Sequence, residues 1–173
     1  MHRSTRRFVA APVAALSALP LMLVLPAAGS VAAATPSTVS CNAPSGPPAS
    51  TAVVGGFHGV TPTRLVDTRQ AQPVPPGCWL RVPVPASVPA EAESLALTVT
   101  SDRALAPGFL TAHGCGSSLP ELSNVNVRPE GPTSNLAVVA VDSTRETCIF
   151  SDHGTDLIVD LVGWFGPGGS PFH

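Results

Sequence analysis

The chain has 173 residues, of which 44% are hydrophobic and only 12% are charged. All nine basic residues are arginine, and the formal net charge of −2 argues against a nucleic-acid protein that relies on basic patches. The 20 prolines and 15 glycines interrupt helical periodicity, which excludes a helical bundle. The apolar content also argues against a disordered chain. A small domain rich in β structure remains.

The first 34 residues have the pattern of an export signal. Arg3, Arg6 and Arg7 precede a long apolar stretch, and small residues then lead to an Ala-Ala-Ala cleavage pattern at 32–34. Prolines interrupt the stretch, which favours a cleaved signal peptide over a membrane anchor, and the adjacent arginines leave a twin-arginine signal open. We therefore expect a secreted protein. Its mature form would have six arginines against eleven acidic residues, a formal charge of −5.

The region after the signal is expected to contain one domain. A linker rich in Pro, Ser and Thr is predicted over 35–55, the domain over 56–166 and a flexible tail over 167–173. No later apolar run is long enough to span a bilayer, so no membrane span is expected after signal removal. The acidic balance also disfavours nucleic acid as a partner.

Four cysteines lie in the expected mature region, and an even number in an exported chain predicts two disulfides. Three connectivities are possible. The alternative is a zinc site in which Cys115 and Cys148 act together with His113 and His153. An oxidising compartment favours disulfides over zinc-bound thiolates, so we expect no metal or cofactor. The expected pairs are Cys41 with Cys78 and Cys115 with Cys148.

Between 55 and 165, short β-forming runs alternate with Pro, Gly and Asn, which is typical of sandwiches and barrels. The run 136–141 is apolar on both faces, which predicts a central strand. The prolines at 83 and 85 predict that 78–84 is an edge strand or ends early. We expect a single antiparallel β-sandwich of about eight short strands, jelly-roll or immunoglobulin-like. The strands are expected near 63–67, 78–84, 94–100, 108–113, 122–127, 135–141, 146–150 and 155–165.

The last strand has a carboxylate on an apolar face. Strict alternation along 156–165 places Asp160 and Trp164 on one face, and Leu157 and Phe165 on the other. A lone carboxylate among apolar neighbours is costly, and an arginine can hold it by two bonds. We therefore predict a partly buried ionic network that ties the first strand to the last. In this network Asp160 and Asp67 are expected to join Arg64 or Arg69.

Ordered motifs along 57–165 also carry a family resemblance. They include RLVDTR at 64–69, SNVN at 123–126 and DLIVDLVGWF at 156–165. Together they resemble a secreted β-sandwich repeat domain of surface proteins and exported hydrolases in high-GC Gram-positive, actinobacterial species. Trp164 stands where that family more usually has Tyr, and Thr98 where it has Asn. The resemblance implies a non-catalytic extracellular module and brings no established ligand.

No nucleophile elbow, phosphate loop, zinc-helix motif or calcium loop occurs in the sequence. A Ser/His/Asp triad could draw on His58, His113 or His153, but nothing places a serine on a strained turn. Ionic pairing explains the carboxylates better than glycoside hydrolysis does, so we expect no enzyme. The carboxylates concerned are Asp67, Asp102, Asp142 and Asp160.

Three asparagines at or near predicted strands need a reason, because asparagine is depleted in strands. Asn124, Asn126 and Asn135, with Trp164, could form a face that binds a sugar or peptide. Alternatively their amides satisfy nearby backbone groups, which is their usual role. The function expected is a non-catalytic binding or adhesion module of the cell envelope. Its candidate partner is a cell-wall glycan or a secreted protein, and a small protease inhibitor that uses the loop 73–78 is the alternative.

Overall fold

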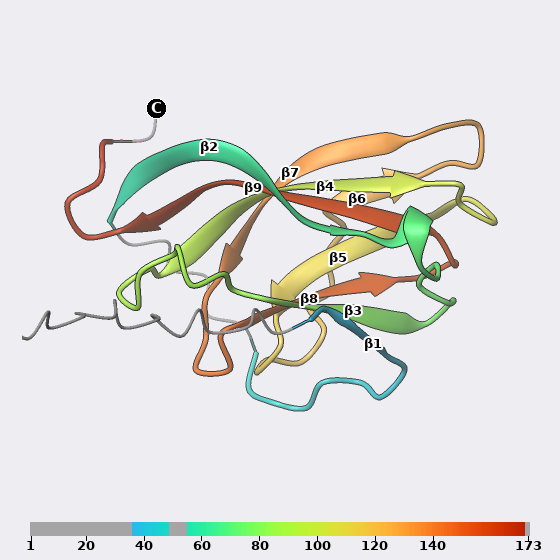
Figure 1. Ribbon diagram of the computed structural model, residues 1–173. Coiled ribbons are helices and arrows are strands. Elements are labelled where there is room, and N and C mark those ends of the chain that lie inside the picture. Colours follow the sequence, from blue (N-terminus) through green and yellow to red (C-terminus); the bar gives the residue numbers. More distant parts are fainter. Residues whose placement is uncertain (1–35, 49–54, 172–173) are drawn as a thin grey trace, which may run out of the picture. The chain divides into compact units, whose positions relative to one another are not determined.

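Two antiparallel β-sheets lie face to face in the computed structural model, which describes residues 36–48 and 55–171 (Figure 1). The predicted signal peptide lies outside these residues. One sheet has the order β1-β3-β8-β5-β6 and the other β2-β9-β4-β7, and a short 3-10 turn, η1 (Thr68–Gln70), follows β2. The strands described are β1 (Thr38–Ser40), β2 (Gly56–Asp67), β3 (Cys78–Pro83), β4 (Ser94–Asp102), β5 (Gly108–Gly114), β6 (Val125–Val127), β7 (Thr133–Ala140), β8 (Glu146–Ser151) and β9 (Asp156–Gly166).

Strand pairing is nested along the chain. β2 pairs with β9, β3 with β8, β4 with β7 and β5 with β6, so the chain resembles one long hairpin rolled over two sheets. Ladders between β4 and β9 and between β5 and β8 complete the sheets. This order is that of a jelly roll, with β1 added at one edge. The predicted antiparallel sandwich is confirmed, and of its two variants the jelly roll is the one observed.

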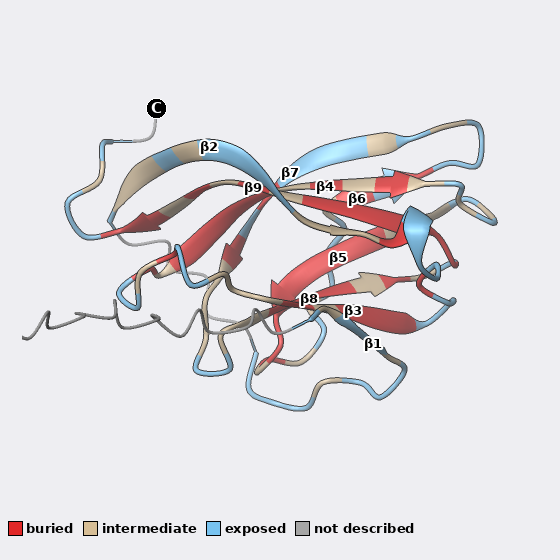
Figure 2. Cartoon of the chain, in the orientation of Figure 1, coloured by how far each residue is buried: buried red, intermediate tan, exposed pale blue. Residues whose placement is uncertain are grey.

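The core lies between the sheets and follows the alternation seen in the sequence. Leu95, Leu97 and Val99 of β4 are no more than 1% exposed, and Leu110 and Ile149 meet them from the facing sheet. Figure 2 shows buried residues concentrated along β4, β9, β5 and β8. Burial of such side chains contributes about 1.5–3 kcal/mol each.

A second, smaller cluster lies on the outer face of the sheet that contains β8. Cys148 and Phe150 alternate with the core residue Ile149, so they point to the opposite side, where they pack with Trp79 and Cys115. The N-terminal segment passes beside this cluster, since Ser118 N donates to the Pro47 carbonyl at 3.3 Å. The sheet is therefore partly covered on its outer face.

The predicted linker and tail are in part ordered. Thr38–Ser40 forms β1, which pairs with Trp79–Arg81 of β3. Three residues are too few to show alternation, so the sequence held no pattern for this strand. In the tail, Ser170 exchanges two backbone hydrogen bonds with Phe57, at 2.7 and 3.0 Å.

The strand β7 is at the edge of its sheet, so the prediction of a central strand over 136–141 is wrong. Ala137 and Val139 face the core at 1% and 2% exposure, whereas Leu136 and Val138 are 46% and 40% exposed. An antiparallel sheet can leave one face toward solvent, so apolar residues on both faces do not require two covering layers. In contrast, β3 ends at Pro83, as its proline predicted.

A bulge at Val162 changes the faces of β9. Leu97 of β4 lies opposite Leu161, but Ala96 lies opposite Gly163, so Val162 is an extra residue without a partner in that ladder. Strict alternation was therefore wrong beyond this point. Trp164 turns toward the core cluster, and Phe165 turns to the other face of the sheet, where it is 4% exposed and its ring packs against Phe57.

Candidate functional site

An ionic network joins β2 to β9 through the residues predicted from sequence. The ladder places Arg64 opposite Asp160, and the guanidinium donates to both Asp160 oxygens, from Nε and, at 3.3 Å, from Nη2. Its Nη1 donates to Asp67 Oδ2 at 3.0 Å. One planar guanidinium thus holds two carboxylates, as its fork geometry favours.

Arg69 extends this network to β4. Its Nε and Nη2 donate to the two oxygens of Asp67 at 2.9 and 2.7 Å, and its backbone N–H also bonds Asp67, which caps η1. Its Nη1 lies 3.5 Å from Asp102. The hydrogen bond from the Arg69 side chain is the main cause that lowers the pKa of Asp67 to about 2. Asp67 is therefore ionised at neutral pH.

A second branch that we did not predict lies beside the first. Asp156 is 5% exposed, accepts a hydrogen bond from Thr68 Oγ1 at 3.0 Å and forms an ion pair with Arg103 Nη2 at 2.9 Å. Arg103 Nη2 also donates to the backbone oxygen of Arg69 at 3.1 Å, so the branches meet at η1. Asp156 and Asp160 are four residues apart in one strand and share a face. This spacing is the feature of the sequence from which the second branch could have been predicted.

The asparagines of the predicted ligand face bond nearby groups. Asn124 Oδ1 accepts from the Ala112 N–H at 2.7 Å. Asn135 Nδ2 donates to the Asn124 backbone oxygen at 2.7 Å, and its Oδ1 accepts from the next backbone N–H at 2.9 Å. Asn126 accepts from Ser123 Oγ at 3.0 Å. The geometry of Asn124 and Asn135 favours the structural interpretation.

Trp164 does not join these asparagines in one face. It lies opposite Leu95 of β4, whereas Asn135 lies opposite Val99, four positions along the same strand. Its ring stacks on the imidazole of His58, with centroids 3.7 Å apart and planes at 5°. Since Trp164 also packs against the core, its contacts are those of a packing residue.

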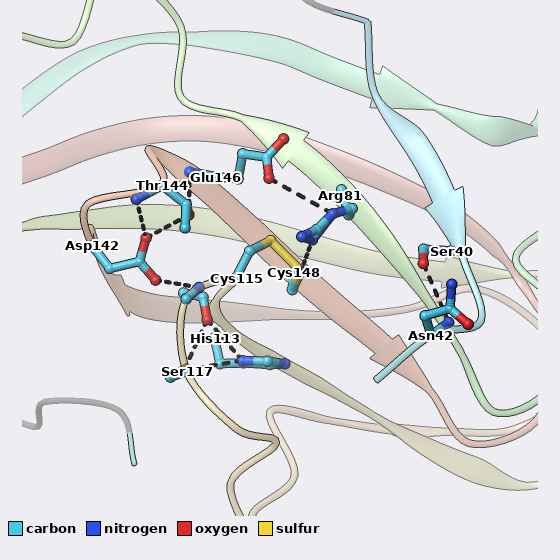
Figure 3. Close-up of a disulfide and its surroundings, with 12 residues drawn as sticks. Ser40, Asn42, Arg81, His113, Cys115, Ser117, Asp142, Thr144, Glu146 and Cys148 are labelled. Atoms are coloured by element: carbon cyan, nitrogen blue, oxygen red, sulfur yellow. Dashed lines mark hydrogen bonds and ion pairs between the residues drawn. A yellow bond between two sulfur atoms is a disulfide. The ribbon is translucent and has the colours of Figure 1, made fainter. Parts of the chain in front are cut away.

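The two disulfides pair as predicted. Cys41–Cys78 joins the N-terminal segment to β3, and Cys115–Cys148 joins the loop after β5 to β8. Figure 3 shows the second disulfide beside Arg81, whose Nη1 lies 3.9 Å from Cys148 Sγ. This bond uses both thiols that the zinc alternative required, so that alternative is overturned.

The histidines of the zinc and triad alternatives have separate surroundings. His113 is 3% exposed, and its Nδ1 lies 3.0 Å from the Gly114 oxygen and 3.2 Å from Ser117 Oγ. Burial lowers the pKa of His113. The Ser117 hydroxyl donates to the Gly114 oxygen at 2.8 Å, so it offers no proton to the imidazole. His153 lies beside Asp152, at 2.8 Å.

The carboxylates considered for glycoside hydrolysis are all engaged. The arginines described above bind Asp67, Asp102 and Asp160. Asp142 Oδ2 accepts from the Gly116 N–H at 2.6 Å, and its other oxygen accepts from the following turn (Figure 3). Each therefore has a structural partner.

The loop 73–78, on which the protease-inhibitor alternative rests, is anchored at both ends. Val74 is fully buried and exchanges hydrogen bonds with Thr155 at 2.9 and 3.1 Å. Gly77 N donates to the Ser151 oxygen at 2.8 Å, and Cys78 is buried. The loop exposes a short turn rather than an extended segment.

Several hollows open on the surface of the described residues, and two of them concern the binding question. A mostly apolar groove of about 420 Å³ lies beside Phe109 and the loop 119–123, where Leu119 and Leu122 are 36% and 48% exposed. A more polar pocket of about 310 Å³ opens where η1, the β4–β5 loop and the start of β9 meet. We call it the η1 pocket. Its walls include Arg69, Ala71, Pro73, Arg103, Leu105 and Asp156.

Comparison with family models, with curated proteins and with solved structures found no match for the chain. Within residues 36–48 and 55–171, no group of three or more His, Cys, Asp or Glu side chains is arranged to hold a metal ion. The same part of the chain contains no helix long and apolar enough to cross a membrane.

Proposed function

We propose that this protein is a secreted, non-catalytic module that binds a component of the cell envelope. Both disulfides support export, because such bonds persist in oxidising compartments outside the cytoplasm. The charged and apolar pattern of residues 1–34 supports the same location. So does the resemblance of 57–165 to secreted actinobacterial repeat domains.

The observation that carries the binding role is the η1 pocket. Its polar walls are fixed without a ligand, because Asp67 holds Arg69 and Asp156 holds Arg103. Side chains that are already fixed lose little entropy when they bind a ligand. Loops at the end of a rigid sandwich are also where binding residues gather.

The surroundings of the candidate catalytic groups support a non-catalytic role. Ser117 and His113 are buried, at 6% and 3% exposure, and the Ser117 hydroxyl donates to the Gly114 oxygen instead of to the imidazole. Asp142 bonds the backbone of its neighbouring loops. These contacts stabilise the loop after β5.

A pull-down tests this proposal. The described residues 36–48 and 55–171 belong to one compact unit, so the oxidised chain from residue 35 onward can be incubated with actinobacterial cell walls, purified peptidoglycan and envelope polysaccharides. We expect saturable retention on at least one fraction. The same chain, reduced and alkylated, is the matched control and should lose retention.

Two results would contradict the proposal. One is the absence of saturable retention on every fraction. The other is a steady release of sugars or peptides from the walls that disappears in Ser117→Ala or Asp142→Asn, since this would indicate an enzyme.

A further inference from the structure

We infer that the η1 pocket binds one neutral sugar residue of an envelope glycan. This inference rests on the proposed function and names the ligand class of the same site. It differs from the ligand face considered from the sequence, because the pocket includes none of its asparagines or Trp164.

The size and the apolar wall of the pocket suit a sugar ring. Its volume of about 310 Å³ is at the lower end for small-molecule sites, which span roughly 300–1,000 Å³. Leu105 is 74% exposed, the most exposed large hydrophobic side chain described, and it lines the pocket with Ala71 and Pro73. A sugar ring presents C–H groups on its face, and these can pack on such a wall.

The polar wall suits neighbouring hydroxyl groups. The Arg103 guanidinium is held at Nη2 by Asp156 and by the Arg69 backbone oxygen, at 2.9 and 3.1 Å. Its Nε and Nη1 bond no other described residue, and the side chain is 57% exposed. The Asp156 carboxylate keeps lone pairs beyond its bonds to Arg103 and Thr68. A fixed donor and a fixed acceptor thus lie side by side, and each sugar hydroxyl can both donate and accept.

The charge around the pocket favours a neutral ligand. Arg69 is paired with Asp67 and Asp102, and Arg103 is paired with Asp156, so both guanidinium groups that line the pocket already contact carboxylates. This pairing disfavours an anion, which would compete with those carboxylates for the same guanidinium groups. A cation is disfavoured because each carboxylate already contacts a guanidinium. A polyhydroxyl ligand needs hydrogen bonds and no net charge.

The backbone at Arg103 supports a functional role. Its φ of 52° is in the left-handed region, which side-chain-bearing residues seldom adopt and which is enriched at functional sites. Arg145 has a similar φ of 53°, but its guanidinium donates to backbone oxygens of Val88, Pro89 and Ala90, which is a structural use. At Arg103 the conformation begins the turn that presents Leu105.

Nuclear magnetic resonance can test this site directly. The oxidised, ¹⁵N-labelled chain from residue 35 is titrated with methyl glycosides of glucose, galactose, mannose, arabinose and N-acetylglucosamine. We expect at least one to shift the amide signals of Ala71, Leu105 and Asp156 saturably. Arg103→Ala and Leu105→Ser should each weaken binding at least about fivefold. Leu105 is so exposed that its substitution leaves the fold intact.

The matched control is Arg128→Ala, which removes an exposed arginine from the neighbouring β6–β7 loop and should leave binding unchanged. Three results would overturn the inference: no glycoside shifts these signals, sodium acetate or phosphate alone shifts them, or Arg128→Ala weakens binding as much as Arg103→Ala. Wall retention of the Arg103→Ala variant separates the two proposals. If the Arg103→Ala variant is still retained on the walls, the pocket assignment fails and the proposed function stands. If the wild type binds a glycoside but is retained on no wall fraction, the pocket assignment stands and the proposed function fails.

Discussion

Arg64 and Arg69 each contact two carboxylates, so two side chains connect β2, η1, β4 and β9. At the same scale, Gly163 leaves room for the ring of Phe57 from the paired strand. These contacts give structural reasons for the Arg-Leu-Val-Asp-Thr-Arg and Gly-Trp-Phe motifs. Because each of these residues contacts specific neighbouring groups, its substitution should change a pKa or the stability of the fold in a predictable direction.

The carboxyl group of Asp67 should titrate unusually low. In the wild type its pKa is about 2, below the ordinary 3.8, because Arg69 donates to it. A depressed pKa in the folded state contributes stability that is present above about pH 3.8 and is lost as the pH falls toward 2. In Arg69→Gln, a carboxyl ¹³C titration should show the pKa of Asp67 rising toward 3.8. Arg81→Gln, whose partner is Glu146, is the control, and an equal rise there would contradict the assignment.

Gly163→Ala should destabilise the protein. The added Cβ would overlap ring carbons of Phe57 and lie 2.8 Å from the His58 oxygen. Overpacking of this kind costs about 1–3 kcal/mol, measurable by urea unfolding. Gly131→Ala is the matched control, since a Cβ there meets nothing within 4 Å, and it should change stability by less than about 0.5 kcal/mol. Equal stability of the two variants would contradict this prediction, because it would mean that the Phe57 ring shifts to accommodate the added methyl group without cost.

At the scale of elements, β7, β9 and β1 show what local patterns leave out. The apolar sequence of β7 did not reveal that one face is open, and the alternation of β9 did not reveal the bulge at Val162. β1 is too short for any pattern and depends on pairing with β3 and on Cys41–Cys78. In each case the structure depends on contacts with other parts of the chain, which a local sequence pattern does not contain.

The loop between β5 and β6 depends on Asn124. In Asn124→Ala the Ala112 N–H would lose its acceptor, and a buried donor without a partner costs about 1–3 kcal/mol. Urea unfolding should show this loss. Asn126→Ala removes an amide whose one bond within the described residues is to the nearby Ser123 side chain, and it should cost less than about 0.5 kcal/mol. The reverse order of the two variants would sink the structural interpretation of Asn124.

At the scale of the molecule, two sheets pack face to face through a shared core, and the N-terminal segment is attached to one of them. The core between the sheets contains side chains from both, whereas the segment 36–48 depends on a short strand and one disulfide. The stability of the protein is therefore uneven. The attachment of the N-terminal segment is its weaker part.

Reduction without denaturant should reach one disulfide first. Cys41 is exposed, whereas Cys115 and Cys148 are 4% and 0% exposed, and exchange needs access of a thiolate to sulfur. Mass spectrometry after alkylation should detect a species modified at Cys41 and Cys78 before it detects one modified at all four cysteines. The singly reduced protein should lose about 2–4 kcal/mol of stability. Simultaneous modification of all four cysteines would contradict this order, and unfolding in urea provides the positive control.

The sandwich, most of its strands, the presence of two disulfides and an ionic tie between Asp160 and the segment 64–69 could be predicted from the sequence alone. These follow from alternation, from cysteine count and from the cost of an unpaired carboxylate, all of which are local or chemical rules. The jelly-roll order, the open face of β7 and the turn of Trp164 toward the core became evident only from the folded structure. The fold also brings Asp156, Arg103 and Leu105 together at η1, because contacts between β4 and β9 depend on register, and register is set by packing across the whole sheet.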